Sequence, residues 1–378
     1  MRALVVAPQP FFSPRGTPFS VYYRTLAAAE LGVETDLLTY GEGRDVDIPG
    51  VTIHRIPRLA LIGPVPIGPS WQKAVLDVFL IAWTIARLAR RRYDFVHAHE
   101  ESVFFLRFLK PLFRFKLVYD MHSSLPQQLH NFGFTTSPLI VGAFRRLEET
   151  CLRHADAVIT ICPELERYAR PRMPDPGRHL LIENSRFDAI RFTAAPAVAP
   201  YVAERPAAVP ESRPVVLYTG TFERYQGLDL LLRAFAYVRS RRPEAFLLMV
   251  GGSPQQVAAY QSQARELGLD GHVAFTGQVD PSVAAAYLKH AAVLTSPRTE
   301  GTNTPLKVYQ QLASGVPLVA TKIPSHTQIL DEQVCFLVEP DADSVADGIV
   351  AALEDGPRRR QVVDRALALY EERYASGA

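Results

Sequence analysis

The sequence predicts an α/β protein made of two parallel-sheet halves, and three observations support this prediction. The length of 378 residues is enough for two domains of roughly 150 residues or more each. Short apolar segments alternate with segments of helical periodicity, which is typical of parallel sheets covered by helices on both faces. Residues 194–214 interrupt this alternation with five prolines and no apolar period, as an extended interdomain linker would.

The first half starts with an apolar strand at residues 3–7, a loop at 9–18 that contains proline and glycine, and a helix at 19–31. Helical periodicity returns at residues 71–92 and 138–154. The remaining strands of this half are expected at residues 35–38, 52–56, 95–98, 117–119 and 157–161.

The second half repeats the pattern after the linker. Its helices are expected at residues 228–239 and 254–267. Its strands are expected at residues 215–218, 246–250, 273–276, 292–295, 318–320 and 335–338. Ligands of such sheets gather at the carboxyl ends of the strands, and a cleft between two such halves is a natural substrate site.

Composition excludes several classes of protein. With 48% hydrophobic and 21% charged residues the chain is neither disordered nor a coiled coil, and a net charge of +2 does not favour nucleic acid as a partner. Three cysteines without CxxC spacing favour neither disulfides nor a metal site, and fit a reducing compartment. The first residues lack a signal-peptide pattern and no window of 18 residues is uninterruptedly apolar, so we expect a soluble or peripheral protein.

The loop and helix at residues 296–315 carry the sharpest chemical signal. They follow an expected strand, and Thr304 and Pro305 suit the cap and first position of a helix whose amino end can bind an anion. Lys307 in the first turn opposes the helix dipole and is better explained by a phosphate. Glu300 would repel that anion unless it binds hydroxyl groups. The alternative is an ordinary capped helix with surface charges.

Two more loops have the same design. Residues 219–227 carry glycines at both ends and Arg224 as a phosphate partner, and residues 14–18 occupy the equivalent place in the first half. Plain strand–helix turns are the alternative for both. Neither GxGxxG nor GxxxxGK[ST] is present, which excludes the usual dinucleotide and P-loop fingerprints.

Three histidines follow expected strand ends. His97 and His99 are one strand period apart, but the spacing supplies no third ligand, so a metal site is not favoured. His122 also comes directly after a strand, where a structural histidine is the alternative to a catalytic one.

These features resemble the GT-B glycosyltransferases, specifically the retaining family 4 group. Residues 300–321, EGTNTPLKVYQQLASGVPLVAT, are similar to that family's EGxxxP…E…AxGxPVVAT nucleotide-sugar stretch. The resemblance covers nearly the whole chain. Its other matches are the Gly16 loop, the HAH strand end, His122, Asn184, the stretch GTFERYQG and the stretch VGGS.

The resemblance implies two Rossmann-like parallel-sheet domains that face each other across a cleft. Residues 1–195 would bind mainly the acceptor, residues 196–214 would be the proline-rich linker, and residues 215–355 would bind the nucleotide-sugar. Residues 356–378 would form a helix that returns toward the first domain. The donor-binding residues implied are Gly16, Thr17, Gly220, Thr221, Arg224, Gln226, Gly251, Asn303, Thr304, Lys307 and Gln310.

The implied reaction is metal-independent transfer of a sugar, with retained configuration, from a nucleoside diphosphate to a saccharide or lipid-linked acceptor. Glu300 and His122 would be the catalytic residues, holding sugar hydroxyls and contacting the sugar respectively, and no cofactor besides the nucleotide-sugar co-substrate is implied. Charge on the departing diphosphate would be met by helix amino ends, the Gly16 and Thr17 amides, Arg224 and Lys307.

The sequence departs from the family pattern at three positions. Thr221 and Gln226 stand where members usually place Arg and Lys, and Gln310 stands where a second Glu grips the ribose. These departures are the argument for an alternative, a catalytically inactive GT-B-like binding protein. A nucleotide-sugar epimerase of the same fold is the other alternative.

Residues 71–116 hold nine Lys and Arg against four acids, interleaved with aromatic residues. Such a surface can bind an anionic bilayer, where a lipid-linked acceptor would be found. We therefore expect a cytoplasmic protein with peripheral binding to the inner face of the cell membrane. Core-packed helices with solvated basic ends are the alternative for this segment.

Overall fold

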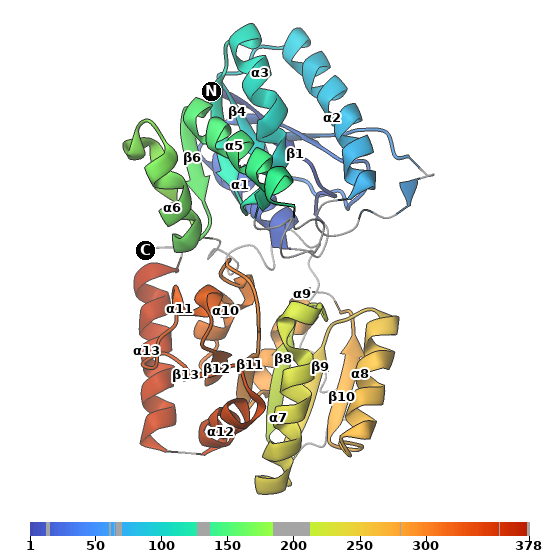
Figure 1. The fold of residues 1–378 in the computed structure, drawn as a ribbon, viewed down its shortest axis with the longest axis vertical. Helices are drawn as coiled ribbons and strands as arrows, with labels where there is room; N and C mark the ends of the chain where they lie inside the picture. Colours follow the sequence, from blue (N-terminus) through green and yellow to red (C-terminus); the bar gives the residue numbers. More distant parts are fainter. Residues whose placement is uncertain are drawn as a thin grey trace. The chain divides into compact units, whose positions relative to one another are not determined.

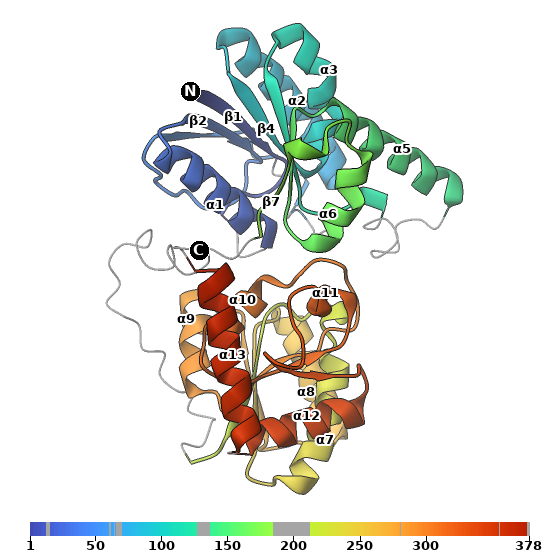
Figure 2. The same ribbon diagram turned by 90° about the vertical axis from the view of Figure 1, so that its left-hand side faces the viewer.

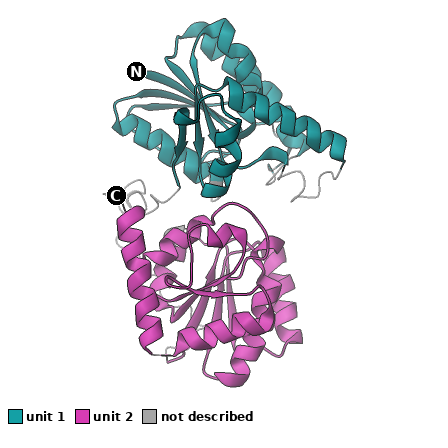
Figure 3. Ribbon diagram, turned by 60° about the vertical axis from the view of Figure 1, so that its left-hand side comes forward, with its two compact units in different colours: residues 1–184 teal, residues 185–378 magenta. Residues whose placement is uncertain are grey.

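The computed structural model describes residues 1–12, 16–59, 62–63, 65, 70–126, 137–183, 212–279, 281–354 and 356–375 (Figure 1). The chain divides into two compact units, Met1–Asn184 and Ser185–Ala378 (Figure 3). The predicted boundary at residue 195, most of the predicted linker, Asn184 and residues 14–15 lie outside the described residues. These domain limits stay predictions.

Unit 1 contains a seven-stranded parallel sheet in the order β3-β2-β1-β4-β5-β6-β7. Its strands are β1 (Arg2–Ala7), β2 (Glu34–Thr39), β3 (Val51–Arg55), β4 (Phe95–His99), β5 (Lys116–Met121), β6 (Ala157–Thr160) and β7 (His179–Leu181). Its helices are α1 (Gly16–Glu30), α2 (Trp71–Arg90), α3 (Val103–Phe113), α5 (Pro138–His154) and α6 (Pro163–Ala169).

Unit 2 contains a six-stranded parallel sheet in the order β10-β9-β8-β11-β12-β13. Its strands are β8 (Val215–Thr219), β9 (Phe246–Val250), β10 (Val273–Gly277), β11 (Val293–Ser296), β12 (Leu318–Thr321) and β13 (Phe336–Val338). Its helices are α7 (Leu228–Arg241), α8 (Pro254–Glu266), α9 (Pro281–Tyr287), α10 (Leu306–Leu312), α11 (Pro324–Thr327), α12 (Ala342–Leu353) and α13 (Pro357–Arg373).

Both faces of the unit 2 sheet are covered, which explains why its strands are continuous apolar runs. Along β8, Val216 and Tyr218 pack with α7, α8 and α12, whereas Val215 and Leu217 pack on the opposite face. That opposite face is covered by α9, α10 and α13 (Figure 2). The two parallel sheets with helices on both sides confirm the predicted fold class.

The sheet order reverses direction once in each unit, between β1 and β4 and between β8 and β11. At such a switch point, the loops after the two neighbouring strands leave toward opposite faces and open a crevice at the carboxyl edge. The chemistry-bearing residues of both units should therefore be sought at these two edges.

Candidate functional site

Three loops pack against one another at the carboxyl edge of the unit 2 sheet. Gly227, with φ 71°, ends the loop after β8, and a Cβ there would overlap the carbonyl oxygen of Pro297 in the loop after β11. Gly251, with φ 128°, follows β9, and its Cβ would overlap the carbonyl oxygen of Gly220. Only glycine permits this close approach, so the sequence here serves to bring the loop backbones together.

Two half-buried cations, Arg298 and Lys307, lie at this edge. Lys307 Nζ lies 4.1 Å from the ring centre of Tyr218, and the Arg298 guanidinium carbon lies 4.9 Å from the ring centre of Tyr225. Arg298 Nη1 donates a hydrogen bond of 3.0 Å to the carbonyl of Asn303. Within the described residues, Lys307 Nζ and Arg298 Nε are buried without a hydrogen-bond partner, and neither side chain forms an ion pair.

The protonation of both cations is disfavoured by their surroundings. Burial and, to a lesser extent, repulsion from Arg298 together lower the pKa of Lys307 to about 7. Burial also lowers the pKa of Arg298. Unpaired buried charge is costly, and an anion bound between these side chains would relieve the cost by giving charge-assisted hydrogen bonds.

Arg298 is a residue that the sequence prediction missed. It comes two positions after the last residue of β11, within the stretch that the sequence had singled out. The available signal was its position just after a strand at the switch point of the sheet, where ligands of such sheets gather.

The predicted donor-binding residues of unit 2 lie around this edge. Gln226 Oε1 and Thr304 Oγ1 are buried and, among the described residues, lack a hydrogen-bond partner. Arg224 is exposed in the short helix Arg224–Gln226, and Gln310 is half-buried on α10. The others are Gly220 and Thr221 directly after β8, Gly251 directly after β9, and Asn303 with its carbonyl on Arg298.

The predicted helix start at Thr304 and Pro305 is wrong by one residue. Pro305 has ψ 127°, an extended value, so it is the capping residue and α10 begins at Leu306. The Thr304 hydroxyl therefore caps no backbone amide. Glu300, the predicted partner of sugar hydroxyls, is exposed on the loop before this helix.

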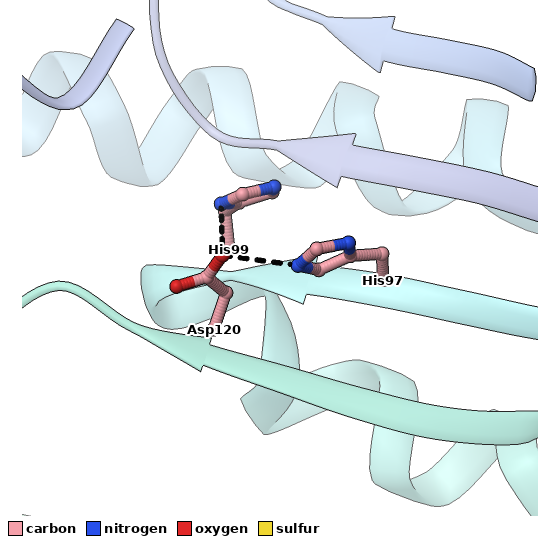
Figure 4. Close-up of side chains that lie close together, drawn as sticks. All are labelled: His97, His99 and Asp120. Carbon is pink, nitrogen blue, oxygen red and sulfur yellow. Dashed lines mark hydrogen bonds and ion pairs between the residues drawn. The ribbon is translucent and has the colours of Figure 1, made fainter. Parts of the chain in front are cut away.

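In unit 1, three histidines lie around the buried carboxylate of Asp120. Figure 4 shows two of them, His97 and His99, beside Asp120. His97 Nε2 lies 3.1 Å from Asp120 Oδ2, and His99 Nδ1 lies 3.7 Å from the same oxygen. His122 Nε2 lies 2.9 Å from His99 Nδ1. Asp120 also binds Arg24, whose Nε lies 3.1 Å from Oδ2.

The charges of this network are fixed by burial and by Arg24. Burial opposes ionisation of Asp120, but the charge of Arg24 and the hydrogen bond from His97 hold its pKa well below its usual range. Burial lowers the pKa of His122 to about 4 and holds the pKa of His99 well below its ordinary value. At neutral pH the network therefore contains an Arg24–Asp120 ion pair beside neutral His99 and His122 rings.

Asp120 is the third candidate metal ligand, which the spacing of His97 and His99 in the sequence could not reveal. One ligand atom from each of the three residues falls within 4.8 Å of the others. However, His97 Nε2 points its hydrogen bond at the carboxylate, and the positive charge of Arg24 already occupies Asp120 Oδ2. These donors fit a hydrogen-bond network better than a divalent ion.

A second group of ionisable side chains follows β4 at the same edge. Glu100 has φ 49°, a conformation that non-glycine residues rarely adopt, and Thr17 Oγ1 donates a 3.4 Å hydrogen bond to its carboxyl group. Burial and the charge of Glu101 raise the pKa of Glu100 to about 7, and they raise that of Asp77 to a similar value. Lys73 Nζ pairs with Glu101 at 2.5 Å.

The two predicted residues of the first glycine loop lie beside this group. Gly16 is the first residue of α1 and Thr17 follows it. Thr17 thus has a carboxyl group as its neighbour, whereas the prediction gave its amide to a diphosphate.

The turn that contains His122 is fixed by hydrogen bonds to a buried glutamate. Glu148 on α5 accepts hydrogen bonds from the Ser124 hydroxyl at 2.9 Å and from the Leu125 amide at 2.8 Å. Burial raises the pKa of Glu148, and its hydrogen bonds partly oppose that rise. The turn after β5 is therefore fixed at two points, by Asp120 and by Glu148.

The predicted basic aromatic surface at residues 71–116 is smaller than expected. Most of its aromatic side chains pack into or against the unit 1 core, and Lys73, Arg91, Lys110 and Lys116 form ion pairs. The exposed apolar side chains on α2 and α3 include Trp71, Val78, Phe108 and Leu112. None of the helices in the described part of the chain combines the length and apolarity that a membrane span requires.

Two family models match the chain, one in each half. Residues 20–185 match a glycosyl transferase 4-like domain, and residues 213–355 match the glycosyl transferases group 1 domain. A phosphatidyl-myo-inositol mannosyltransferase of Mycolicibacterium smegmatis is 24% identical over 374 residues, which is 97% of this chain and 88% of that protein. The Mycobacterium tuberculosis protein of the same description is 32% identical over 162 residues, 41% of this chain and 42% of the relative.

Solved structures share the fold. A sucrose-phosphate synthase from Thermosynechococcus elongatus superposes with a TM-score of 0.73 at 22% sequence identity. The match covers 99% of this chain and 94% of the synthase chain. The Anabaena protein Alr3699/HepE in complex with UDP-glucose has a TM-score of 0.70 at 16% identity, covering 99% of this chain and 95% of its own.

Proposed function

Because this chain belongs to the GT-B glycosyltransferases of the family 4 type, we propose that it moves a sugar from a nucleoside diphosphate to a hydroxyl group of a saccharide or lipid-linked acceptor, with retention of configuration. The observation that carries the donor half of this proposal is a pair of cations, Arg298 and Lys307, whose buried nitrogens have no counter-ion among the residues that the structure describes. A diphosphate is the part of such a donor that would neutralise both.

The chain's own side chains suffice for the proposed binding of the diphosphate. Arg298 and Lys307 would neutralise the charge that develops on the departing diphosphate. They would thereby replace the Arg and Lys that the family usually places at the positions of Thr221 and Gln226. Gln226 Oε1 and Thr304 Oγ1 would bind hydroxyl or amide groups of the donor, since both are buried without partners among the described residues. Glu300 and His122 keep their proposed roles toward the sugar.

Nucleotide binding is the first test. Thermal-shift assays with nucleoside diphosphates, with and without EDTA, should show a rise in Tm that EDTA does not remove. Lys307→Met should abolish the rise, and Lys289→Met, an exposed lysine of the same unit, should keep it. A protein that no nucleotide stabilises would contradict the donor assignment and favour the inactive binding protein.

The reaction itself is tested by mass spectrometry of products formed from a panel of nucleotide-sugars and saccharide or lipid acceptors. Retention is read from the anomeric coupling of the isolated product. A donor converted into an isomeric sugar nucleotide without acceptor would instead indicate the epimerase, which neither family model favours.

We also propose peripheral binding to an anionic bilayer through α2 and α3. These neighbouring helices expose Trp71, at 63%, and Phe108, at 66%, with Arg107 over the Phe108 ring. Apolar side chains beside arginines are the combination that interfacial helices use. Co-sedimentation with phosphatidylglycerol vesicles at low salt should fall in the Trp71→Ser/Phe108→Ser variant and stay unchanged in Leu31→Ser, an exposed leucine elsewhere in unit 1. Equal sedimentation of all three proteins would refute this part.

A further inference from the structure

A buried histidine connects the strand that leads to Arg298 with the neighbouring strand. His326 on α11 is fully buried, as are Ser296 at the end of β11 and Thr321 at the end of β12. His326 Nε2 lies 2.9 Å from the Ser296 hydroxyl oxygen, and Nδ1 lies 2.8 Å from the Thr321 carbonyl oxygen. Because β11 and β12 are paired in parallel, the ring joins two adjacent strand ends at the carboxyl edge of the sheet.

The proton positions in this group follow from the Thr321 carbonyl. A carbonyl oxygen can only accept a hydrogen bond, so His326 Nδ1 carries the proton of the neutral ring. Nε2 is then an acceptor, and the Ser296 hydroxyl donates to it. The Thr321 hydroxyl donates in turn to the Arg298 carbonyl, to which it lies nearer than to the Ser296 carbonyl at 3.4 Å. Each of these three protons therefore has an acceptor.

The surroundings of His326 keep its ring neutral. Burial, followed by the charges of Lys307 and Arg298, lowers the pKa of His326 to about 3, although the hydrogen bond to the Thr321 carbonyl opposes this. At neutral pH the ring therefore keeps the unprotonated nitrogen to which the Ser296 hydroxyl donates. Both cations of the unit 2 edge thus lie close enough to act on this ring.

The residues on either side of Arg298 are held by other contacts. The Pro297 carbonyl lies against Gly227, and the Thr299 amide donates a 3.0 Å hydrogen bond to the Tyr225 carbonyl. Between these two contacts, the Thr321 hydroxyl holds the Arg298 carbonyl. The direction in which the Arg298 side chain leaves the loop therefore depends on Thr321 and, through Thr321, on His326.

We infer that His326 is a positioning residue for Arg298. Its ring fixes the ends of β11 and β12 to each other, and the Thr321 hydroxyl then fixes the Arg298 backbone, so that the guanidinium stays near Lys307. Because the ring is fully buried, it acts through Arg298 and not on a substrate. The binding of a diphosphate by Arg298 rests on the proposed function, whereas the hydrogen-bond chain does not.

The wild-type protein provides the first test of the hydrogen-bond chain. We would record nitrogen-15 NMR spectra of the full-length protein labelled at histidine, and identify the His326 signals by their absence from His326→Asn. At pH 7 and at pH 5, His326 should have a protonated Nδ1 and an unprotonated Nε2. A ring protonated on Nε2, or on both nitrogens, would overturn the proposal. This measurement needs neither a donor nor an acceptor.

A matched pair of His326 variants tests the positioning role. In His326→Asn the amide nitrogen can take the place of Nδ1 and donate to the Thr321 carbonyl, whereas in His326→Gln the amide lies near the place of Nε2. The probe is inorganic pyrophosphate, the part common to nucleoside diphosphates, titrated in a calorimeter. We expect His326→Gln to weaken its binding by at least about tenfold and His326→Asn to stay within about threefold of the wild type. Equal losses in both variants would refute the positioning role.

The Thr321 hydroxyl is tested by a second pair, which keeps the proposal falsifiable if the His326 variants do not fold. Valine has the shape of threonine without its hydroxyl, whereas serine keeps the hydroxyl. Thr321→Val should weaken pyrophosphate binding by at least about tenfold, and Thr321→Ser should keep it within about threefold. Unchanged binding in Thr321→Val would show that the Arg298 backbone does not depend on this contact.

A double-mutant cycle separates positioning from a general effect on folding. Arg298→Met should itself weaken pyrophosphate binding by at least about tenfold. If His326 acts through Arg298, adding His326→Gln to Arg298→Met should cost no more than about threefold further. Losses that multiply would show that His326 acts independently of Arg298, and the positioning role would be refuted. A wild type that binds neither pyrophosphate nor a nucleoside diphosphate would instead refute the donor assignment, whatever the tautomer of His326.

Discussion

Replacing Lys307 by methionine should stabilise unit 2 while it abolishes donor binding. Folding moves the pKa of this lysine from its ordinary value of 10.5 to about 7. A shift of about 3.5 units corresponds to about 5 kcal/mol of lost stability at pH values where the folded protein keeps the proton, and to about 4 kcal/mol at pH 7. Methionine has a similar length and carries no charge, so it removes this cost.

The substitution also loses the contact between Lys307 Nζ and the Tyr218 ring, which is about 1–2 kcal/mol for a desolvated pair. The net expectation is about 2–3 kcal/mol of added stability at pH 7. For a unit of this size that is a rise in Tm of roughly 4–12 °C.

The pH dependence of the stability gain distinguishes removal of a buried charge from better packing of the methionine side chain. The folded pKa lies below the unfolded one, so between pH 7 and 10.5 the unfolded chain binds more protons than the folded chain. The loss of stability caused by Lys307 is therefore complete below pH 7, and it disappears as the pH rises toward 10.5. The gain from Lys307→Met should shrink over the same window.

Differential scanning calorimetry of the full chain from pH 6 to 10 measures the effect, and hydrogen exchange in peptides from β8 and β11 assigns it to unit 2. Lys289→Met is the matched control, since Lys289 is exposed in the same unit, and it should change neither Tm nor its pH dependence. A Lys307→Met protein that is less stable than the wild type at pH 7 would show that the ammonium has a partner, and the reasoning would be wrong.

The same contacts give three further expected outcomes. Affinity for a nucleotide-sugar, whose diester phosphates keep their charge, should fall by up to about tenfold per pH unit above pH 7 as Lys307 loses its proton, and a flat calorimetric profile in that range would contradict it. Gly251→Ala should cost unit 2 about 2–4 kcal/mol in urea unfolding because its Cβ overlaps a neighbouring carbonyl, whereas Gly271→Ala, with open space around it, should cost about 1 kcal/mol. Glu148→Ala should destabilise unit 1 by about 2–4 kcal/mol, since a buried hydroxyl and a buried amide lose their acceptor, and an unchanged unfolding midpoint would refute that role.

The strands were predictable because a parallel strand buried on both faces is a continuous apolar run. Residues 246–250 match β9 at both ends, and 138–154 match α5 in the same way, because Pro138 suits the first helical position. The helix Val103–Phe113 was not predicted: its apolar residues have a helical period, but it is short and Pro111 interrupts its helix propensity.

The site was predictable only where one loop carries all its parts. Lys307 could be singled out because a basic residue in a first helical turn is unfavourable on local grounds. The partnership of Asp120 with His97 could not, because it depends on which strands become neighbours and in what register. The ion pair of Lys73 with Glu101 could not be predicted either, because it depends on how α2 packs beside the residues that follow β4.

The two sheet edges differ in charge, and this limits what each can bind. The unit 2 edge holds two cations without a counter-ion among the described residues, whereas the unit 1 edge holds Glu100, Glu101 and Asp77 with Lys73 as their partner. A phosphate near Thr17 would face the Glu100 carboxyl, whose pKa of about 7 would have to rise further before the two could coexist. Hydroxyl groups meet no such repulsion, since an ionised carboxylate accepts their hydrogen bonds. On the proposed function, we therefore expect the diphosphate to bind at the unit 2 edge and hydroxyl-bearing parts of the substrates to bind at the unit 1 edge.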